Sequence, residues 1–358
     1  MAYFVLLTVW TFISYILSKR IKGDKKKIYC VLMFLATTIL MGLRSRYVGG
    51  VDTNLYFIPA FQRISNFSSI KQLLLNYVSK DPLFYISTWG FTRISTDYNL
   101  WIFTISAIVM ASFCLFVYRY SDNPPVAFIV YFALGYYTIG FQMMRHVLAV
   151  SVLLFSYKEI QEKHLLRFIV IVLIASGFHS TALIFLIAYP LAHYNIGLKQ
   201  WAFIGAAIIA IYFFRTKIVN VLNLIFINNN RYSKFTSENY GIQLSAMGLI
   251  ILLCVYAASY YLCPKEEMKG TAKGLFNLCA IGVAFMSMIA IIAEFHRISM
   301  YFGIYNTILL PNAMKKYNGK YQYKLIINGL IVIILIMYFI LFRVGNDFLD
   351  SYNFFWND

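Results

Sequence analysis

A short stretch of the chain brings together two arginines, two glycines and a carboxylate. It reads Arg44-Ser-Arg46-Tyr-Val-Gly49-Gly50-Val-Asp52-Thr53-Asn-Leu-Tyr56. A guanidinium group binds phosphate oxygens through two parallel hydrogen bonds, and paired glycines let the backbone turn tightly or approach a ligand closely. These residue types predict that Arg44 and Arg46 bind a phosphate or an anionic sugar, and that Asp52 is a base or binds a sugar hydroxyl. A helix-end turn with a local Arg–Asp pair is the structural alternative.

A second pair of polar residues, Arg145 and His146, opens the apolar segment at 143–160. A charged side chain costs about 2.5–3.5 kcal/mol at the centre of a bilayer and less near the interface. A partner or a ligand must offset this cost, which makes Arg145 a candidate for binding or catalysis. Snorkelling to the interface and an internal ion pair are the alternatives.

His179 lies within the apolar segment 165–190. A helix rises about 1.5 Å per residue, which places His179 about 22 Å from the start of this segment and at about the depth of Arg145. A neutral imidazole can remove a proton from a hydroxyl group. The alternative is a structural histidine bonded to a backbone or hydroxyl group. No second His or Cys stands at metal-ligand spacing from it, so we expect neither a metal nor a cofactor.

Two further arginines stand among polar and aromatic residues. Arg297 lies between Glu294 and Tyr301, and Arg231 follows three asparagines. Arginine, asparagine and tyrosine together suit contacts with sugars and phosphates, although this signal is not specific. For Arg297 the structural alternative is a helix cap in which it pairs with Glu294 at i, i+3.

The composition places these residues in an integral membrane protein. The 358-residue chain is 61% hydrophobic and 13% charged, whereas a soluble domain is about 25% charged. A helix needs about 20 apolar residues to cross a bilayer, and the sequence predicts a single all-α polytopic domain over residues 1–358 with about ten to twelve spans. The clear candidates are residues 2–18, 28–43, 98–118, 126–140, 143–160, 165–190, 201–214, 243–262, 274–293, 298–313 and 325–342.

Two weaker apolar runs, 82–94 and 218–227, leave the number of spans open. If 218–227 crosses and 82–94 does not, the lysine-rich loops fall on one side, which the positive-inside rule makes cytoplasmic. Both termini and the singled-out arginines then face outward, with outer loops at about 44–81 and 228–242. The lysine-rich loops are residues 19–27, 158–167, 265–273 and 315–324.

Several other classes of protein are excluded. The net charge is +17, but the basic residues occupy short loops between apolar runs, so we expect contact with membrane lipid rather than nucleic acid. The five cysteines are scattered and form no CxxC pair, so the sequence gives no sign of a zinc site. The first apolar run has no basic start and no evident cleavage site, so we predict a retained span rather than a signal peptide.

The ordered set of motifs resembles the EpsG family, which are Wzy-like polymerases of bacterial exopolysaccharide and capsule. The likeness extends over about residues 25–315. Its segments are the 44–56 stretch, Met144-Arg145-His146-(x)2-Ala149, Phe178-His179-Ser180 and Arg297-(x)3-Tyr301-Phe302. The family commonly has Gln where this chain has His146, which argues against a universal role for that histidine.

The resemblance implies a glycosyltransferase of the bacterial inner membrane, and because no metal motif is visible we expect it to be metal-independent. Such enzymes transfer a glycan from undecaprenyl pyrophosphate to the non-reducing end of the next lipid-linked repeat unit, on the outer face. It also implies a helical fold like that of GT-C-type membrane glycosyltransferases. The partners that it implies are the lipid-linked oligosaccharide and, in addition, a chain-length regulator or a flippase.

This chemistry assigns roles to the candidate residues. Asp52 and then His179 are the candidates for proton removal, and Arg145 and Arg297 are expected at the pyrophosphate, with Arg145 counted as catalytic. Arg44 and Arg46 are expected at the pyrophosphate or an anionic sugar. The remaining candidates for substrate binding are Tyr56, His146, Arg231 and Tyr301.

Three other functions compete with a polymerase. An O-antigen-type ligase would attach finished glycan to another acceptor. A flippase for lipid-linked sugars would carry ionisable residues through both leaflets, often on broken helices, whereas here they gather near one face. A scaffold protein would not need buried arginines.

Overall fold

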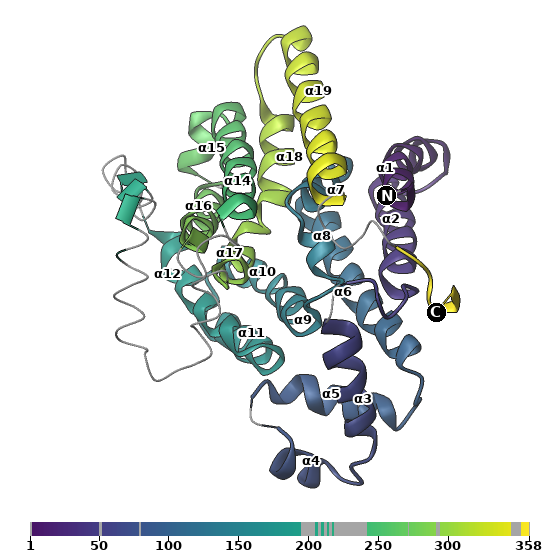
Figure 1. The fold of residues 1–358 in the computed structure, drawn as a ribbon. Helices are drawn as coiled ribbons and strands as arrows, with labels where there is room; N and C mark the ends of the chain where they lie inside the picture. Colours follow the sequence, from purple (N-terminus) through teal and green to yellow (C-terminus); the bar gives the residue numbers. More distant parts are fainter. Residues whose placement is uncertain are drawn as a thin grey trace. The chain divides into compact units, whose positions relative to one another are not determined.

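The computed structural model describes residues 2–49, 52–78, 80–194, 205–206, 209–210, 213–214, 217, 242–270, 272–290, 294–344 and 352–357. Every regular element within these residues is a helix, which confirms the all-α prediction. The chain forms two compact units, Met1–Leu183 with Tyr317–Asp358, and Ile184–Lys316. We call them unit 1 and unit 2 and describe each by itself; Figure 1 labels their helices.

The first helices of unit 1 define two ends. A lysine-rich turn joins α1 (Ala2–Arg20) to α2 (Lys25–Gly42), and the Asp24 side chain caps α2 by accepting hydrogen bonds from two N–H groups of its first turn. The long helix α6 (Tyr98–Tyr120) runs back alongside α2. At one end the Tyr118 hydroxyl donates to Asp24 at 2.8 Å, and at the other the Arg46 guanidinium lies 5.4 Å from the Tyr98 ring. We call these the lysine end and the motif end.

Three short helices lie at the motif end: α3 (Ile58–Ser65), α4 (Ile70–Asn76) and α5 (Pro82–Thr92), seen together in the lower part of Figure 1. The chain leaves α2 and enters α6 at this same end. Residues 82–94 therefore do not carry the chain across to the lysine end. The prediction that all lysine-rich loops lie on one side of the membrane likewise requires that residues 82–94 do not cross.

Few of the described helices are long enough to cross a membrane unaided. Ala2–Arg20, Tyr98–Tyr120 and Tyr321–Leu341 have the length and apolar composition to do so, and several shorter apolar helices accompany them. Other helices of unit 1 are α7 (Pro124–Ala133), α8 (Tyr136–Ile139), α9 (Met144–Leu153), α10 (Ser156–Gln161) and α19 (Tyr321–Tyr338). The number of spans stays a prediction, and residues 218–227 lie outside the described part of the chain.

The expected continuous helix over 165–190 is wrong. The structure has α11 (Leu165–Phe178), a 3-10 helix η2 (Ser180–Ile187) and α12 (Ala188–His193). The break falls at His179, whose φ of −153° and ψ of 114° are extended rather than helical. A residue that was expected inside a helix therefore stands at a helix end, where backbone groups are free to bond elsewhere.

The glycine-containing motif packs closely against the chain that precedes α9. Gly49 has φ +108°, and a Cβ atom there would lie 2.2 Å from the carbonyl oxygen of Phe141. Arg44 donates to that same oxygen at 3.1 Å and also to the carbonyl of Met41. The Thr53 hydroxyl is a second donor to the Phe141 oxygen, at 3.3 Å. One carbonyl group thus joins the first sequence motif to the second.

Gly49→Ala is expected to destabilise the protein. Alanine would need a positive φ, a kind of strain that costs about 1–3 kcal/mol, and would also displace the Phe141 carbonyl. We expect the Tm of the detergent-purified protein to fall by at least about 3 °C. Gly90→Ala is the matched control, because a Cβ at Gly90 in α5 meets nothing within 4 Å. Equal Tm values for the two variants would contradict this description of the turn.

The C-terminal tail returns to the motif end. The Tyr352 hydroxyl donates to the Leu40 carbonyl at 2.8 Å, and the Phe355 N–H donates to the Leu43 carbonyl at 3.0 Å. The ring of Tyr3 lies 5.1 Å from that of Tyr352. The start of α1, the end of α2 and the tail therefore share one end of unit 1.

Unit 2 is a smaller group of helices. Gly282 allows two of them to approach closely, since a Cβ there would lie 2.7 Å from the N atom of Gly303, and the Ser299 hydroxyl donates to the Gly282 carbonyl at 2.7 Å. Lys316 and Glu267 form an ion pair at 2.7 Å. The helices are α12, α14 (Ile242–Leu262), α15 (Lys265–Lys269), α16 (Lys273–Ser287), α17 (Phe295–Gly303) and α18 (Asn306–Lys316).

Candidate active site

A buried carboxylate, Asp81, stands at the centre of a charged cluster at the motif end. Its side chain is fully shielded from solvent. Arg145 donates to its Oδ2 atom at 3.0 Å, and the N–H of Ser180 donates to its Oδ1 atom at 2.8 Å. His179 Nδ1 lies 3.6 Å from Oδ2, an ion-pair separation longer than a hydrogen bond. Three distant parts of the chain therefore converge on one carboxyl group.

The ends of three helices position this cluster. Asp81 directly precedes Pro82 of α5 in a left-handed conformation, with φ 56° and ψ 50°, which is uncommon for a residue other than glycine. Arg145 is in the first turn of α9. Ser180 begins η2, and its N–H bonds to Asp81 instead of continuing the ladder of α11. The helix break thus supplies a backbone donor to the carboxylate.

The carboxyl group of Asp81 is held ionised. Burial raises its pKa, but the His179 ring, the Ser180 N–H and the charge of Arg145 lower it more, so the pKa lies below its ordinary value of 3.8. A buried charge persists only where it is paired and hydrogen-bonded, and here both conditions are met.

Two tyrosines form the wall beside Arg145. The ring of Tyr56 lies 5.1 Å from the Arg145 guanidinium carbon, within the range of a cation–π contact. The Tyr56 and Tyr85 hydroxyls are 2.8 Å apart and share a hydrogen bond. Tyr56 is 40% exposed, whereas Tyr85 is buried. Arg145 is therefore bounded by a carboxylate and an aromatic face while 18% of its side chain stays accessible.

The two predicted histidines are neighbours in the structure. The rings of His146 and His179 meet edge to face with centroids 5.6 Å apart. His146 is buried. The Nε2 atom of His179 has no hydrogen-bond partner among the described residues. Both ring nitrogens of His179 are buried, and Nδ1 also makes no hydrogen bond within the described residues.

The first sequence motif is split between different surroundings. Arg44 is 1% exposed, and its bonds to Met41 and Phe141 place it beside the last turn of α2, where backbone carbonyls favour a cation. Arg46 lies over the rings of Tyr47 and Tyr98. Asp52 is exposed at the start of the π-helix η1 (Thr53–Phe57). Of this motif, Tyr56 is the residue that contacts the Asp81 cluster.

The remaining candidates lie elsewhere in the chain. Arg297 and Tyr301 are in α17 of unit 2, where Tyr301 is buried and the Nε atom of Arg297 has no hydrogen-bond partner within the described residues. Arg231 and residues 228–241 of the predicted outer loop at about 228–242 lie outside the described residues. The structure therefore brings together Tyr56, Arg145, His146 and His179, and adds Asp81, Tyr85 and the Ser180 N–H.

Sequence reasoning did not find Asp81. A signal was present, because Arg145 required an offsetting group and Asp81 stands immediately before an apolar segment that does not cross. The 64 residues between the two partners exceed any helical or hairpin spacing. Local patterns therefore could not pair them.

The fold and the site together define an integral membrane protein, built of apolar helices, with a buried ionic site at the end of unit 1 away from its lysine-rich turn. Comparison with known families places it further: the EpsG family matches residues 27–357, nearly the whole chain, and the chain belongs to that family. It is thus a membrane protein of the polysaccharide-polymerase type. Neither the curated proteins nor the solved structures include a match.

Proposed function

We propose that this protein is a glycosyltransferase that polymerises lipid-linked repeat units. In this proposal it transfers a glycan from undecaprenyl pyrophosphate to the non-reducing end of another lipid-linked unit, at the outer leaflet of the bacterial inner membrane. The observation that carries the proposal is the Asp81–Arg145–His179 cluster, which combines a base with a fixed cation at the motif end. A likeness to GT-C-type folds and a chain-length regulator or flippase as partner belong to the same proposal.

The reaction requires a proton acceptor, which we assign to His179. The acceptor hydroxyl oxygen forms a bond to C1 of the donor sugar while the bond between C1 and the pyrophosphate oxygen breaks. The hydroxyl proton passes to His179 Nε2. Asp81 faces the other ring nitrogen and favours the tautomer protonated at Nδ1, which leaves the Nε2 lone pair free, as the carboxylate does in catalytic triads.

The leaving group is a diphosphate, and its developing charge needs a cation held in place. We assign this role to Arg145, which Asp81 and Tyr56 fix in position. Tyr56 and His146 shape the surroundings and contact the glycan. Arg46, Arg297, Arg231 and Tyr301 remain proposed contacts to the pyrophosphate or the sugars.

Two residues of the first motif take different proposed roles. Arg44 is buried against backbone carbonyls, and we assign it to positioning the turn that contains Gly49. Asp52 remains the competing proton acceptor. Its exposed position and its lack of a contact to His179 make it the second choice.

Glycan size in cells that lack the protein tests the function. A polymerase predicts single repeat units on the lipid carrier and no long chains. A ligase predicts long chains that stay on undecaprenyl pyrophosphate. Supplying repeat units already on the outer leaflet would restore polymer if the protein were a flippase. Normal polymer in the deletion strain would contradict all three functions.

A further inference from the structure

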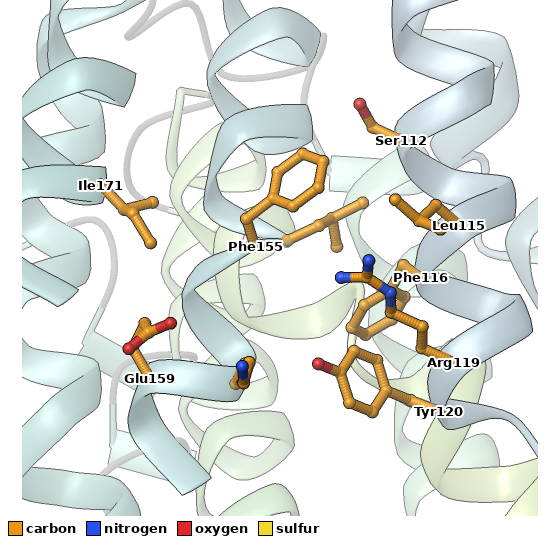
Figure 2. Close-up of a pocket in the computed structure, with 10 residues that line it drawn as sticks. Ser112, Leu115, Phe116, Arg119, Tyr120, Phe155, Glu159 and Ile171 are labelled. Carbon is orange, nitrogen blue, oxygen red and sulfur yellow. The ribbon is translucent and has the colours of Figure 1, made fainter. Parts of the chain in front are cut away.

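A groove at the lysine end of unit 1 is separate from the candidate active site. It lies between α6, the junction of α9 with α10, and α11, and encloses about 160 Å³. It exists because α9 ends at Leu153 and α10 begins at Ser156, so the helix is interrupted and Phe155 projects outward, 43% exposed. Figure 2 shows Arg119 and Tyr120 extending from α6 toward this junction.

The groove has an apolar part and a polar part that contains two cations. Leu115, Phe155 and Ile171 form apolar walls, and Arg119 and Lys158 stand at the polar end. This end of the groove lies near the lysine turn, since Tyr118, one residue before Arg119 in α6, donates its hydroxyl to Asp24. The rings of Tyr120 and Tyr157, which are 4.9 Å apart, join α6 to α10 beside it.

The positive charges of Arg119 and Lys158 are only weakly paired with carboxylates of the protein. Within the described residues, the guanidinium group of Arg119 makes no hydrogen bond and no ion pair. Lys158 is 3.8 Å from Glu162, and both side chains are about half exposed, so this pair is weak. The one carboxylate that lines the groove, Glu159, is engaged by His164 Nδ1 at 3.1 Å. The polar end of the groove therefore favours an anion.

We infer that this groove binds an anionic glycerophospholipid, with its phosphate at Arg119 and Lys158 and an acyl chain along Leu115, Phe155 and Ile171. A soluble anion would leave the apolar walls uncovered, whereas a phospholipid satisfies both parts. The volume is below that of pockets for drug-sized ligands, about 300–1,000 Å³, so only the headgroup region and part of a chain enter and the rest stays in the bilayer. Basic pockets between helices on the cytoplasmic side bind anionic lipids in this way.

Native mass spectrometry of the full-length protein tests the site. The protein is titrated with phosphatidylglycerol or with phosphatidylcholine of the same chain length. Each groove cation near a lipid surface contributes about 5-fold in affinity, so Arg119→Gln with Lys158→Gln is expected to weaken phosphatidylglycerol binding about 25-fold. Ile171→Trp, which fills the groove without changing charge, should also reduce it. Lys163→Gln, a charge change in the neighbouring loop, is the matched control and should retain binding.

Three outcomes would overturn the inference. They are equal retention of the two lipids by the wild-type protein, undiminished phosphatidylglycerol binding in both groove variants, and full displacement of the lipid by millimolar glycerol phosphate, which would indicate a site for a soluble anion. Size-exclusion profiles of all variants establish that a loss of binding does not come from misfolding.

Discussion

His179→Ala should abolish polymer formation while the protein inserts and folds normally. Losing a general base lowers a reaction rate by about 10²–10⁴-fold, and His179 is the residue to which we assign proton removal. The side chain is 12% exposed and has an ion-pair contact to Asp81 only through Nδ1, so its removal should cost modest stability. Cells that carry the variant should accumulate single repeat units on the lipid carrier.

His164→Gln is the control for this prediction. His164 also pairs with a carboxylate, Glu159, but at the lysine end of unit 1, so its loss should leave chain length unchanged. Asp52→Asn tests the competing proton acceptor in the same strain. If His179→Ala makes full-length polymer and Asp52→Asn makes none, the base is Asp52 and the assignment of His179 is wrong.

Arg145→Ala should be damaging in two separable ways. It removes the cation proposed for the diphosphate, an effect of about 10²–10³-fold for a single stabilising donor. It also leaves the fully buried carboxylate of Asp81 without its charged partner. Removing one member of a buried ion pair costs about 3–5 kcal/mol of stability. We therefore expect both low activity and a large fall in Tm.

A double variant separates these two effects. Asp81→Asn with Arg145→Gln removes both charges, so neither partner is left as an unpaired buried ion. We expect its Tm to recover most of the loss seen in Arg145→Ala, because replacing both members of a buried pair is much less costly than removing one. Its activity should stay lost. Recovery of polymerisation along with stability would show that the pair is only structural.

The helical class and the membrane setting could be predicted because composition and apolar run length determine them. Arg145 and His179 could be singled out because a polar residue in an apolar segment is unfavourable without a partner. Their roles relative to each other could not be predicted, since the contacts that join them, such as Ser180 N–H to Asp81, span 99 residues.

Local periodicity also predicts the wrong structure for the segment at 165–190. Its residues are apolar on both sides of His179, so the sequence pattern predicts an uninterrupted helix. At the break the Ser180 N–H donates to Asp81, which lies 99 residues away in the sequence. Similarly, Arg44 has the residue type expected at a phosphate, but the carbonyls of Met41 and Phe141 occupy its guanidinium group.

The most direct test of the proposed activity uses the purified protein with a synthetic undecaprenyl-pyrophosphate-linked repeat unit in the presence of a metal chelator. A polymerase should give a ladder of products longer by whole repeat units, with one undecaprenyl pyrophosphate released for each unit added. The wild-type protein and His164→Gln should give this ladder, and His179→Ala should not. Unchanged substrate with the wild-type protein would contradict the polymerase activity, and an equal ladder with His179→Ala would contradict the role of His179.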